Sequence, residues 1–230
     1  MGCARADRCP AMGTLSMTDR VLDRAWAAAW VTLAARVIAE NRSALNTLDR
    51  DIGDGDHGEN MDRGFEEVVV RLADSPADGT PGDVLKLVAT TLISTVGGAS
   101  GPLYGTAFLK AAIAVGSVDT LDPLATVAML TAARDGIVLR GKAESGDKTM
   151  VDAWTPAVQA AEKSQQAGGD VWAVLRAAAE AAARGAVATE PLIARKGRAS
   201  YLGERACGHR DPGAESTRLL LRAAVDAVVG

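Results

Sequence analysis

Residues 21–37 read VLDRAWAAAWVTLAARV, and this stretch determines the class of fold. Its apolar side chains recur every three or four positions, at Leu22, Trp26, Ala29, Trp30, Leu33 and Val37. This spacing places them on one face of an α-helix. We therefore expect a first helix over about 18–46, with Thr18 as its N-cap.

The composition of the whole chain also favours helices. Aromatic residues make up only 3% of the 230 residues, hydrophobic residues make up 48%, and alanine is abundant. Strands favour β-branched and aromatic side chains, whereas alanine is the best helix former. A chain of this length can bury one substantial core. We predict an all-α protein.

Seven further segments show helical spacing, and none has the alternation of a strand. Three of them open with a capping residue and a proline, at Thr80-Pro81, Asp122-Pro123 and Asp211-Pro212. Asn60 is a candidate cap for another. The expected helices cover about 61–73, 81–96, 103–115, 123–140, 147–165, 170–188 and 212 onward. Short links favour antiparallel neighbours, so we expect eight up-and-down helices.

Every second link between these helices is rich in glycine and in charged residues. These links are the segments 49–58, 97–102, 141–148 and 195–211. In an up-and-down bundle, alternate links lie at the same end. The four links should therefore converge at one end of the bundle, and that end is the predicted site.

The first of these links lies within LDRDIGDGDHG (48–58) and carries four aspartates, Asp49, Asp51, Asp54 and Asp56. Charges this close repel one another, so a bound cation would stabilise the cluster. Carboxylates suit Mg²⁺ or Ca²⁺, but an EF-hand is excluded because its obligatory glycine falls on Glu59 or on Asp54. The pattern favours Mg²⁺ with a phosphorylated ligand. The alternative is a solvated acidic turn whose aspartates cap nearby amides.

The second link, GGASGPLYGT (97–106), offers free backbone amides and Ser100 just before a helix. Amides at a helix N-terminus suit an anion. The alternative is a tight turn that needs glycine for positive φ.

The third link resembles a P-loop but departs from it. In GIVLRGKA, Ala143 stands where serine or threonine must bind Mg²⁺, and in GKAESGDKT, Asp147 replaces the lysine. No strand precedes either segment, so a Walker A motif is excluded.

The fourth link carries five basic residues, Arg195, Lys196, Arg198, Arg205 and Arg210. Such a run is often a solvated surface. Here it should face the acidic first link, which favours contact with phosphate. The two histidines of the chain, His57 and His209, both lie in the predicted site links.

The remaining features set the class of protein and its partners. Net charge is −4, so a nucleic-acid backbone is not an expected partner. No apolar run approaches the roughly 20 residues that span a bilayer, and membrane binding is not expected. Cys3, Cys9 and Cys207 fit no zinc pattern, so we expect reduced thiols in a cytoplasmic protein. Residues 1–16 lack the apolar core of a signal peptide, and we expect a disordered extension there, with Met12 or Met17 as candidate starts.

Taken in order, these motifs identify a family. GDGDHG with NMDRGF, then GGASGPLYGT, GKAESGDKTM, ARKGRASYLGER and GHRDPGA resemble the L subunit of dihydroxyacetone kinases, from about Met17 to the C-terminus. The resemblance implies a closed barrel of eight antiparallel helices with nucleotide at one end, so that residues 17–230 form one nucleotide-binding domain.

The resemblance also implies a ligand set. Two Mg²⁺ ions would be held by Asp49, Asp54 and Asp56, whereas Asp51 matches no ligand position. ADP or ATP would be contacted by the residues that match the family's nucleotide positions, which are His57, Asn60, Ala99, Ser100, Gly141, Met150, Arg198, Asp211 and Gly213. No catalytic residue is implied on this chain beyond that site.

The resemblance implies partners as well. Dihydroxyacetone would sit on a separate K subunit, and bound ADP would be rephosphorylated in place by an M subunit that carries phosphohistidine. A homodimer is left open. Three alternatives also remain: an ATP-dependent kinase for dihydroxyacetone or a related ketose with free nucleotide exchange, a non-catalytic nucleotide- or Ca²⁺-binding module, and a subunit phosphorylated on His57 or His209.

Overall fold

The computed structural model describes residues 21–228, and these form an all-α protein, as predicted. Apart from an isolated bridge between Leu22 and Leu121, the described residues contain no strand. The helices are α1 (Arg24–Ile52), α2 (His57–Ala73), α3 (Pro81–Thr95), α4 (Ser100–Val115), α5 (Pro123–Gly141), α6 (Val151–Gln166), α7 (Val171–Ala188), the 3₁₀-helix η2 (Arg198–Ala206) and α8 (Pro212–Asp226). The expected extension over 1–16 and the expected cap Thr18 lie outside the described residues.

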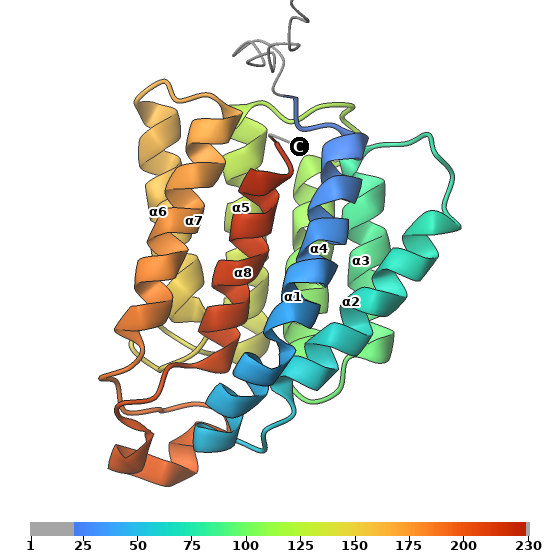
Figure 1. The fold of residues 1–230 in the computed structure, drawn as a ribbon. Coiled ribbons are helices and arrows are strands. Elements are labelled where there is room, and N and C mark those ends of the chain that lie inside the picture. Colours follow the sequence, from blue (N-terminus) through green and yellow to red (C-terminus); the bar gives the residue numbers. More distant parts are fainter. Residues whose placement is uncertain (1–20, 229–230) are drawn as a thin grey trace, which may run out of the picture.

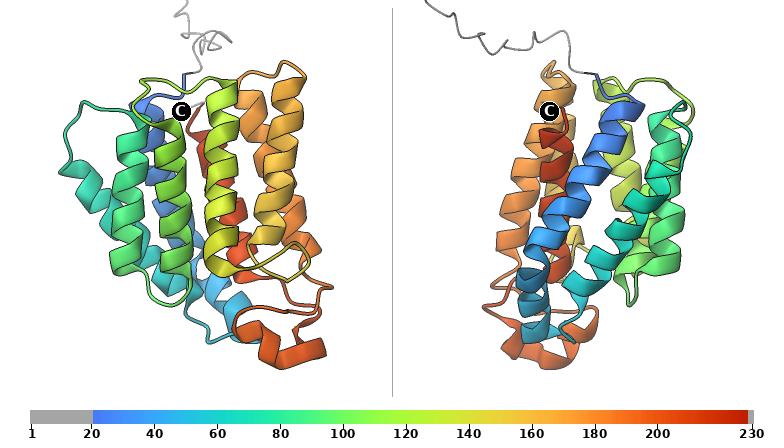
Figure 2. Two further views of the ribbon diagram at one scale, coloured as in Figure 1. Left: turned by 180° about the vertical axis from the view of Figure 1, so that it is seen from behind. Right: turned by 45° about the vertical axis from the view of Figure 1, so that its right-hand side comes forward.

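The helices run up and down beside one another (Figure 1). Each α-helix packs against the next one in the chain, and α8 packs against α1. Figure 2 shows the same arrangement from behind and from the side. None of the described helices combines the length and the apolar character needed to cross a membrane.

Two tryptophans on one face of α1 join the first helix to the last. Trp26 and Trp30 stack with their ring centroids 5.3 Å apart. Their Nε1 atoms donate to backbone carbonyls of α8, at Ala224 (3.0 Å) and Leu220 (2.9 Å). Buried indoles keep their N–H groups bonded in this way. The stretch at 21–37 therefore specifies both the helix and its partner.

The predicted cap-and-proline starts are confirmed. The side chains of Thr80, Asp122 and Asp211 accept hydrogen bonds from the backbone amides of α3, α5 and α8, and a proline follows each of them. Thr80 also forms a capping box with Asp83. A proline in the first turn costs no hydrogen bond, because amides there have no partner within the helix.

The predicted bounds of the first two helices are wrong. Helix α1 continues to Ile52, so Asp49 lies on a helix and not in a loop. Its cap is Asp23. The apolar spacing persists past residue 46, with Ile52 still buried, and the chain breaks only at Gly53.

Helix α2 begins at His57, with Asp56 at its N-cap, so Asn60 lies inside the helix and does not cap it. The amide of Glu59 bonds instead to the side chain of Asn46 on α1 (3.1 Å). A long-range partner therefore replaces the local cap that the sequence pattern indicated.

Two other helix starts differ from expectation, and one short helix was not expected. Helix α4 begins at Ser100, because Pro102 is tolerated in a first turn. Helix α6 begins later, at Val151, because the Asp152 carboxylate bonds the amides of Gly146 (2.5 Å) and Thr149 (2.8 Å) and holds that link as a loop. The fourth link contains η2, which the sequence pattern did not show.

The alternate links converge at one end of the bundle, as the parity of the links predicted. The links after α1, α3, α5 and α7 lie at the lower end in Figure 1, and the two ends of the described chain lie at the upper end.

Candidate functional site

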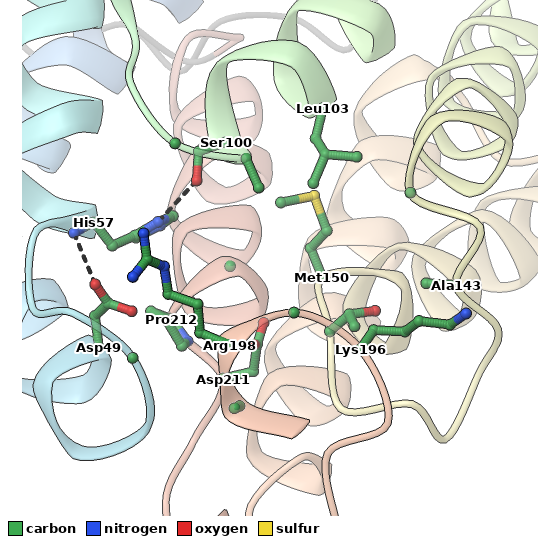
Figure 3. Close-up of a pocket in the computed structure, with 18 of the residues that line it drawn as sticks. Asp49, His57, Ser100, Leu103, Ala143, Met150, Lys196, Arg198, Asp211 and Pro212 are labelled. Carbon is green, nitrogen blue, oxygen red and sulfur yellow. Dashed lines mark hydrogen bonds between the residues drawn. The ribbon is translucent and has the colours of Figure 1, made fainter. Parts of the chain in front are cut away.

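A pocket of about 540 Å³ lies at this lower end and is lined by all four glycine-rich links. Cavities of this size commonly hold small molecules. Figure 3 shows side chains from several helices turned toward it. All twelve residues predicted from the resemblance line this pocket: Asp49, Asp54, Asp56, His57, Asn60, Ala99, Ser100, Gly141, Met150, Arg198, Asp211 and Gly213.

Three carboxylates gather at one side of the pocket. One oxygen from each of Asp49, Asp54 and Asp56 lies within 4.8 Å of the others. Asp49 is buried in the last turn of α1, and its Oδ2 accepts hydrogen bonds from the amides of Asp56 (2.9 Å) and His57 (3.1 Å). Burial raises the pKa of Asp49, although these two bonds act in the opposite direction. An all-oxygen set of carboxylates fits Mg²⁺.

The other aspartate of this segment points elsewhere. The Asp51 carboxylate pairs with His209 Nδ1 at 3.2 Å, and neither residue lines the pocket. Two positions along a helix correspond to a rotation of about 200°, which separates Asp51 from Asp49. This placement is consistent with the expectation that Asp51 is not a ligand.

The N-terminus of α4 faces the pocket from the second link. Ala99 makes no side-chain capping bond, so the first amides of α4 are free to bind an anion. The first turn of α4 packs closely against the backbone that precedes it. A Cβ atom at Gly101 would lie 2.2 Å from the Val96 carbonyl oxygen, and only glycine fits there. Ser100 Oγ lies 3.0 Å from His57 Nδ1.

His57 is buried between Ser100 and α8. Its Nε2 lies 2.9 Å from Ser216 Oγ, so both ring nitrogens have a hydroxyl partner. Burial lowers the pKa of His57 to about 4, and the ring is neutral near pH 7. A ring held at both nitrogens is poorly placed to carry phosphate, which weighs against the phosphohistidine alternative for this residue.

The opposite side of the pocket is apolar. Leu103, Ile137, Ala143 and Met150 line it, and Figure 3 shows Leu103 and Met150 turned toward each other. At Gly141 a Cβ atom would lie 3.2 Å from Leu103, so a side chain there would crowd this wall. A wall of this kind suits a flat aromatic base, whereas the acidic side suits cation-bound phosphates.

The basic fourth link is divided between two environments. Lys196 and Arg198 line the pocket, and Arg198 Nη2 lies 3.1 Å from Asp54 Oδ2. Arg210 instead bonds Glu190 (2.8 Å) and Glu215 (2.9 Å). The prediction that the whole run faces the acidic link is therefore wrong, because nearby glutamates neutralise Arg210.

Asp211 lies at the pocket and caps α8 through the amide of Ala214 (2.7 Å). The pKa of Asp211 is raised to about 7, mainly by burial and also by the charges of Asp152 and Asp49, whereas the hydrogen bond from the Ala214 amide and the charge of Lys148 act in the opposite direction. Its carboxyl group therefore titrates near neutral pH.

Lys148 is a site residue that sequence reasoning missed. Its side chain is 1% exposed, and its ammonium group donates to the carbonyl oxygens of Thr189 (2.6 Å), Glu190 (3.3 Å) and His209 (2.5 Å). Burial lowers its pKa, although the nearby Asp211 carboxylate opposes the shift. Lys148 joins the third link to the fourth and fixes the pocket wall. A lysine in a polar motif gave no local signal of burial.

Comparison with known proteins identifies a family and close relatives in sequence. The DAK2 domain family matches residues 51–226. The chain is 45% identical over 193 residues to the PEP-dependent dihydroxyacetone kinase, ADP-binding subunit DhaL, of Escherichia coli, covering 84% of this chain and 91% of that protein. It is 44% identical over 208 residues to the corresponding subunit of kinase 1 from Listeria innocua, covering 90% and 98%.

A solved structure shows the same fold. It is the dihydroxyacetone kinase from C. freundii in complex with AMP-PNP and Mg²⁺, with a TM-score of 0.65 and 24% identity. The match covers 97% of this chain and 38% of that one, so this chain corresponds to a part of the larger protein. The family match and the sequence identities to the two DhaL subunits show that the chain belongs to the DAK2 domain family.

Proposed function

We propose that this chain is the nucleotide-binding subunit of a dihydroxyacetone kinase. It would hold ADP or ATP through Mg²⁺ on Asp49, Asp54 and Asp56, and pass the γ-phosphoryl group to dihydroxyacetone on a separate K subunit. One observation carries the proposal: three carboxylates within 4.8 Å lie in the same pocket as an uncapped helix N-terminus and an apolar wall. The names of the two DhaL relatives support it.

Phosphoryl transfer requires the protein to position the reacting groups and to offset charge, and no covalent bond to the protein is needed. Mg²⁺ bound at the three aspartates would neutralise part of the phosphate charge. The amides at the start of α4 would bind a phosphate, and the wall at Leu103 and Met150 would hold the base. Arg198, which is 71% exposed beside Asp54, would supply positive charge to the outer phosphate.

The source of the phosphoryl group is the second part of the proposal. The relatives are named as PEP-dependent enzymes, which supports a phosphohistidine-bearing M subunit that rephosphorylates ADP while it stays bound. Two Mg²⁺ ions and contacts from all four links would make ADP leave slowly. The alternative is an ATP-dependent kinase, for this or a related ketose, in which nucleotide exchanges freely.

Two measurements test the proposal. Mass analysis of ligand released from freshly purified, denatured protein should find ADP, and metal analysis of the Mg·ADP complex should find two Mg²⁺ per chain. With K subunit and excess ATP, the chain should give one stoichiometric burst of dihydroxyacetone phosphate and then need the donor protein. Sustained turnover without the donor would favour the ATP-dependent alternative. Turnover by this chain alone would contradict the role as a subunit.

A further inference from the structure

A line of buried hydroxyl groups runs from the pocket into the core through His57. Ser100 Oγ contacts His57 Nδ1 (3.0 Å), and Ser216 Oγ contacts His57 Nε2 (2.9 Å). Ser216 Oγ in turn lies 2.7 Å from the hydroxyl of Tyr104. Ser100 lines the pocket, as Figure 3 shows, whereas Ser216 and Tyr104 are fully buried. The imidazole therefore connects a group at the pocket to two hydroxyls in the core.

Each ring nitrogen of His57 contacts one hydroxyl, so the two hydrogen bonds at the ring must run in the same direction when the imidazole is neutral. A neutral imidazole has one N–H and one acceptor nitrogen. In the inward direction, Ser100 donates to Nδ1, and the Nε2–H group donates to Ser216. In the outward direction, Tyr104 donates to Ser216, Ser216 donates to Nε2, and the Nδ1–H group donates to Ser100. The direction of these hydrogen bonds therefore determines which tautomer His57 adopts.

The surrounding contacts favour the outward direction. The competing acceptor for Ser216 is the Gly213 carbonyl oxygen at 3.1 Å, and this oxygen already accepts from Thr217 Oγ1 at 2.8 Å. Tyr104 lies closer to Ser216 (2.7 Å) than to Thr217 (3.0 Å) or to Gly213 O (3.1 Å). The shortest arrangement therefore uses Tyr104 as donor to Ser216, which leaves the Ser216 proton for His57.

The two directions present opposite groups to the pocket. Inward, the Ser100 proton is used by His57, and Ser100 offers a ligand only oxygen lone pairs, which a phosphate oxygen repels. Outward, Ser100 accepts from His57 and keeps its proton for the ligand. We propose that Tyr104 and Ser216 are positioning residues that hold His57 in the Nδ1–H tautomer, so that the Ser100 hydroxyl donates to a nucleotide phosphate. This inference rests on the proposed nucleotide function.

The tautomer of His57 can be observed directly, because the chain has only two histidines. Long-range ¹H–¹⁵N correlation spectra of the full chain, labelled at histidine, should be recorded near pH 7 with and without Mg·ADP. His209→Gln, which removes the half-buried histidine outside the pocket, assigns the signals. With Mg·ADP bound, Nδ1 of His57 should show the chemical shift of a protonated nitrogen and Nε2 that of an unprotonated one. The Nε2–H tautomer in that complex would overturn the inference.

Variants separate positioning from folding. Loss of one buried hydrogen bond corresponds to roughly a tenfold change in an equilibrium constant, so Ser216→Ala should raise the Kd for Mg·ADP about tenfold and give a mixture of tautomers. Tyr104→Phe should act in the same direction by about threefold. Thr126→Val is the matched control, since it removes a buried hydroxyl that donates to the Asp122 carbonyl oxygen, outside both the pocket and the His57 cluster; its Kd should stay within about twofold and its tautomer unchanged.

The outcomes are distinguishable. If Ser216→Ala and Tyr104→Phe keep their helical circular dichroism and bind Mg·ADP with the wild-type Kd and tautomer, the positioning role is wrong, and the proposed function stands. If Ser216→Ala fails to fold, the Tyr104→Phe variant and the wild-type spectrum still test the positioning role. If the wild-type chain binds no Mg·ADP in calorimetry, the proposed function and this inference fall together.

Discussion

Replacing Asp56 with asparagine should strengthen the metal-free fold and abolish nucleotide binding. The clustered oxygens of Asp49, Asp54 and Asp56 lie within 4.8 Å of one another. Two unit charges at that distance repel by about 3.5 kcal/mol at an effective dielectric constant of about 20, and by about 0.9 kcal/mol in bulk water. Asp56 is exposed, so the lower part of this range applies to each of its two pairs.

The Asp56→Asn substitution removes few stabilising interactions. Asp56 is the N-cap of α2 but makes no side-chain capping bond, and asparagine is an equally good cap. The lost interaction with the helix dipole is worth about 0.3–1 kcal/mol. We therefore expect Asp56→Asn to stabilise the metal-free protein by about 1–2 kcal/mol, which raises its Tm by roughly 2–8 °C. Binding of Mg·ADP should become undetectable, because one of three carboxylate ligands is gone.

Thermal unfolding, monitored by circular dichroism, tests both the predicted stabilisation and the predicted loss of binding. Each variant is measured in chelator and then with Mg·ADP, which should raise the Tm of the wild type and not that of Asp56→Asn. Asp51→Asn is the matched control, since Asp51 pairs with His209 outside the pocket; its Tm and its response to Mg·ADP should match the wild type. A lower Tm of Asp56→Asn in chelator would show that the repulsion among the three carboxylates is smaller than calculated, and a full response to Mg·ADP would show that Asp56 is not a cation ligand.

Three further predictions concern the fourth link and its support. Arg198→Ala should slow phosphoryl transfer at least about tenfold with unchanged circular dichroism, whereas Arg205→Ala, outside the pocket, should not; equal rates for both variants would refute this role. Lys148→Met should destabilise the fold by about 2–4 kcal/mol in urea unfolding, because three carbonyl oxygens lose a charged donor; an unchanged midpoint would contradict it. Burial raises the pKa of Asp211 to about 7, so its contribution to stability is full below 3.8 and is lost as pH rises through about 7. Asp211→Asn, which keeps the cap, should lose less stability than the wild type between pH 5 and pH 8, and an equal loss would rule this out.

The sequence predicted those features of the fold that depend on neighbouring residues. A capping side chain followed by proline is a local signal, and it located the starts of α3, α5 and α8. The parity of the links needs only the order of the helices, and it predicted that four distant segments meet at one end, where they line one pocket. Both rest on backbone hydrogen bonding and chain connectivity, which the order of residues determines directly.

Features that depend on distant partners could not be predicted. Asn60 looked like a cap, but Asn46 on α1 performs that task for α2. Arg210 looked like a phosphate ligand, yet Glu190 and Glu215 neutralise it. The partner of His57, Ser216, lies 159 positions away. No pattern within one segment indicates such contacts, because they exist only after the helices pack.

The position of Asp49 on a helix explains why glycines accompany the aspartates. Asp49 is fixed by α1, so Asp54 and Asp56 can approach it only if the chain reverses at once after Ile52. At Gly53, a Cβ atom would lie 2.3 Å from Asp49 Oδ1, inside contact distance, and Gly55 has φ of 78°, which other residues rarely adopt. The segment 53–56 then returns the amide of Asp56 to within 2.9 Å of the Asp49 carboxylate. The two glycines are therefore as much a part of the acidic cluster as its carboxylates, because they alone allow the chain to bring those charges together.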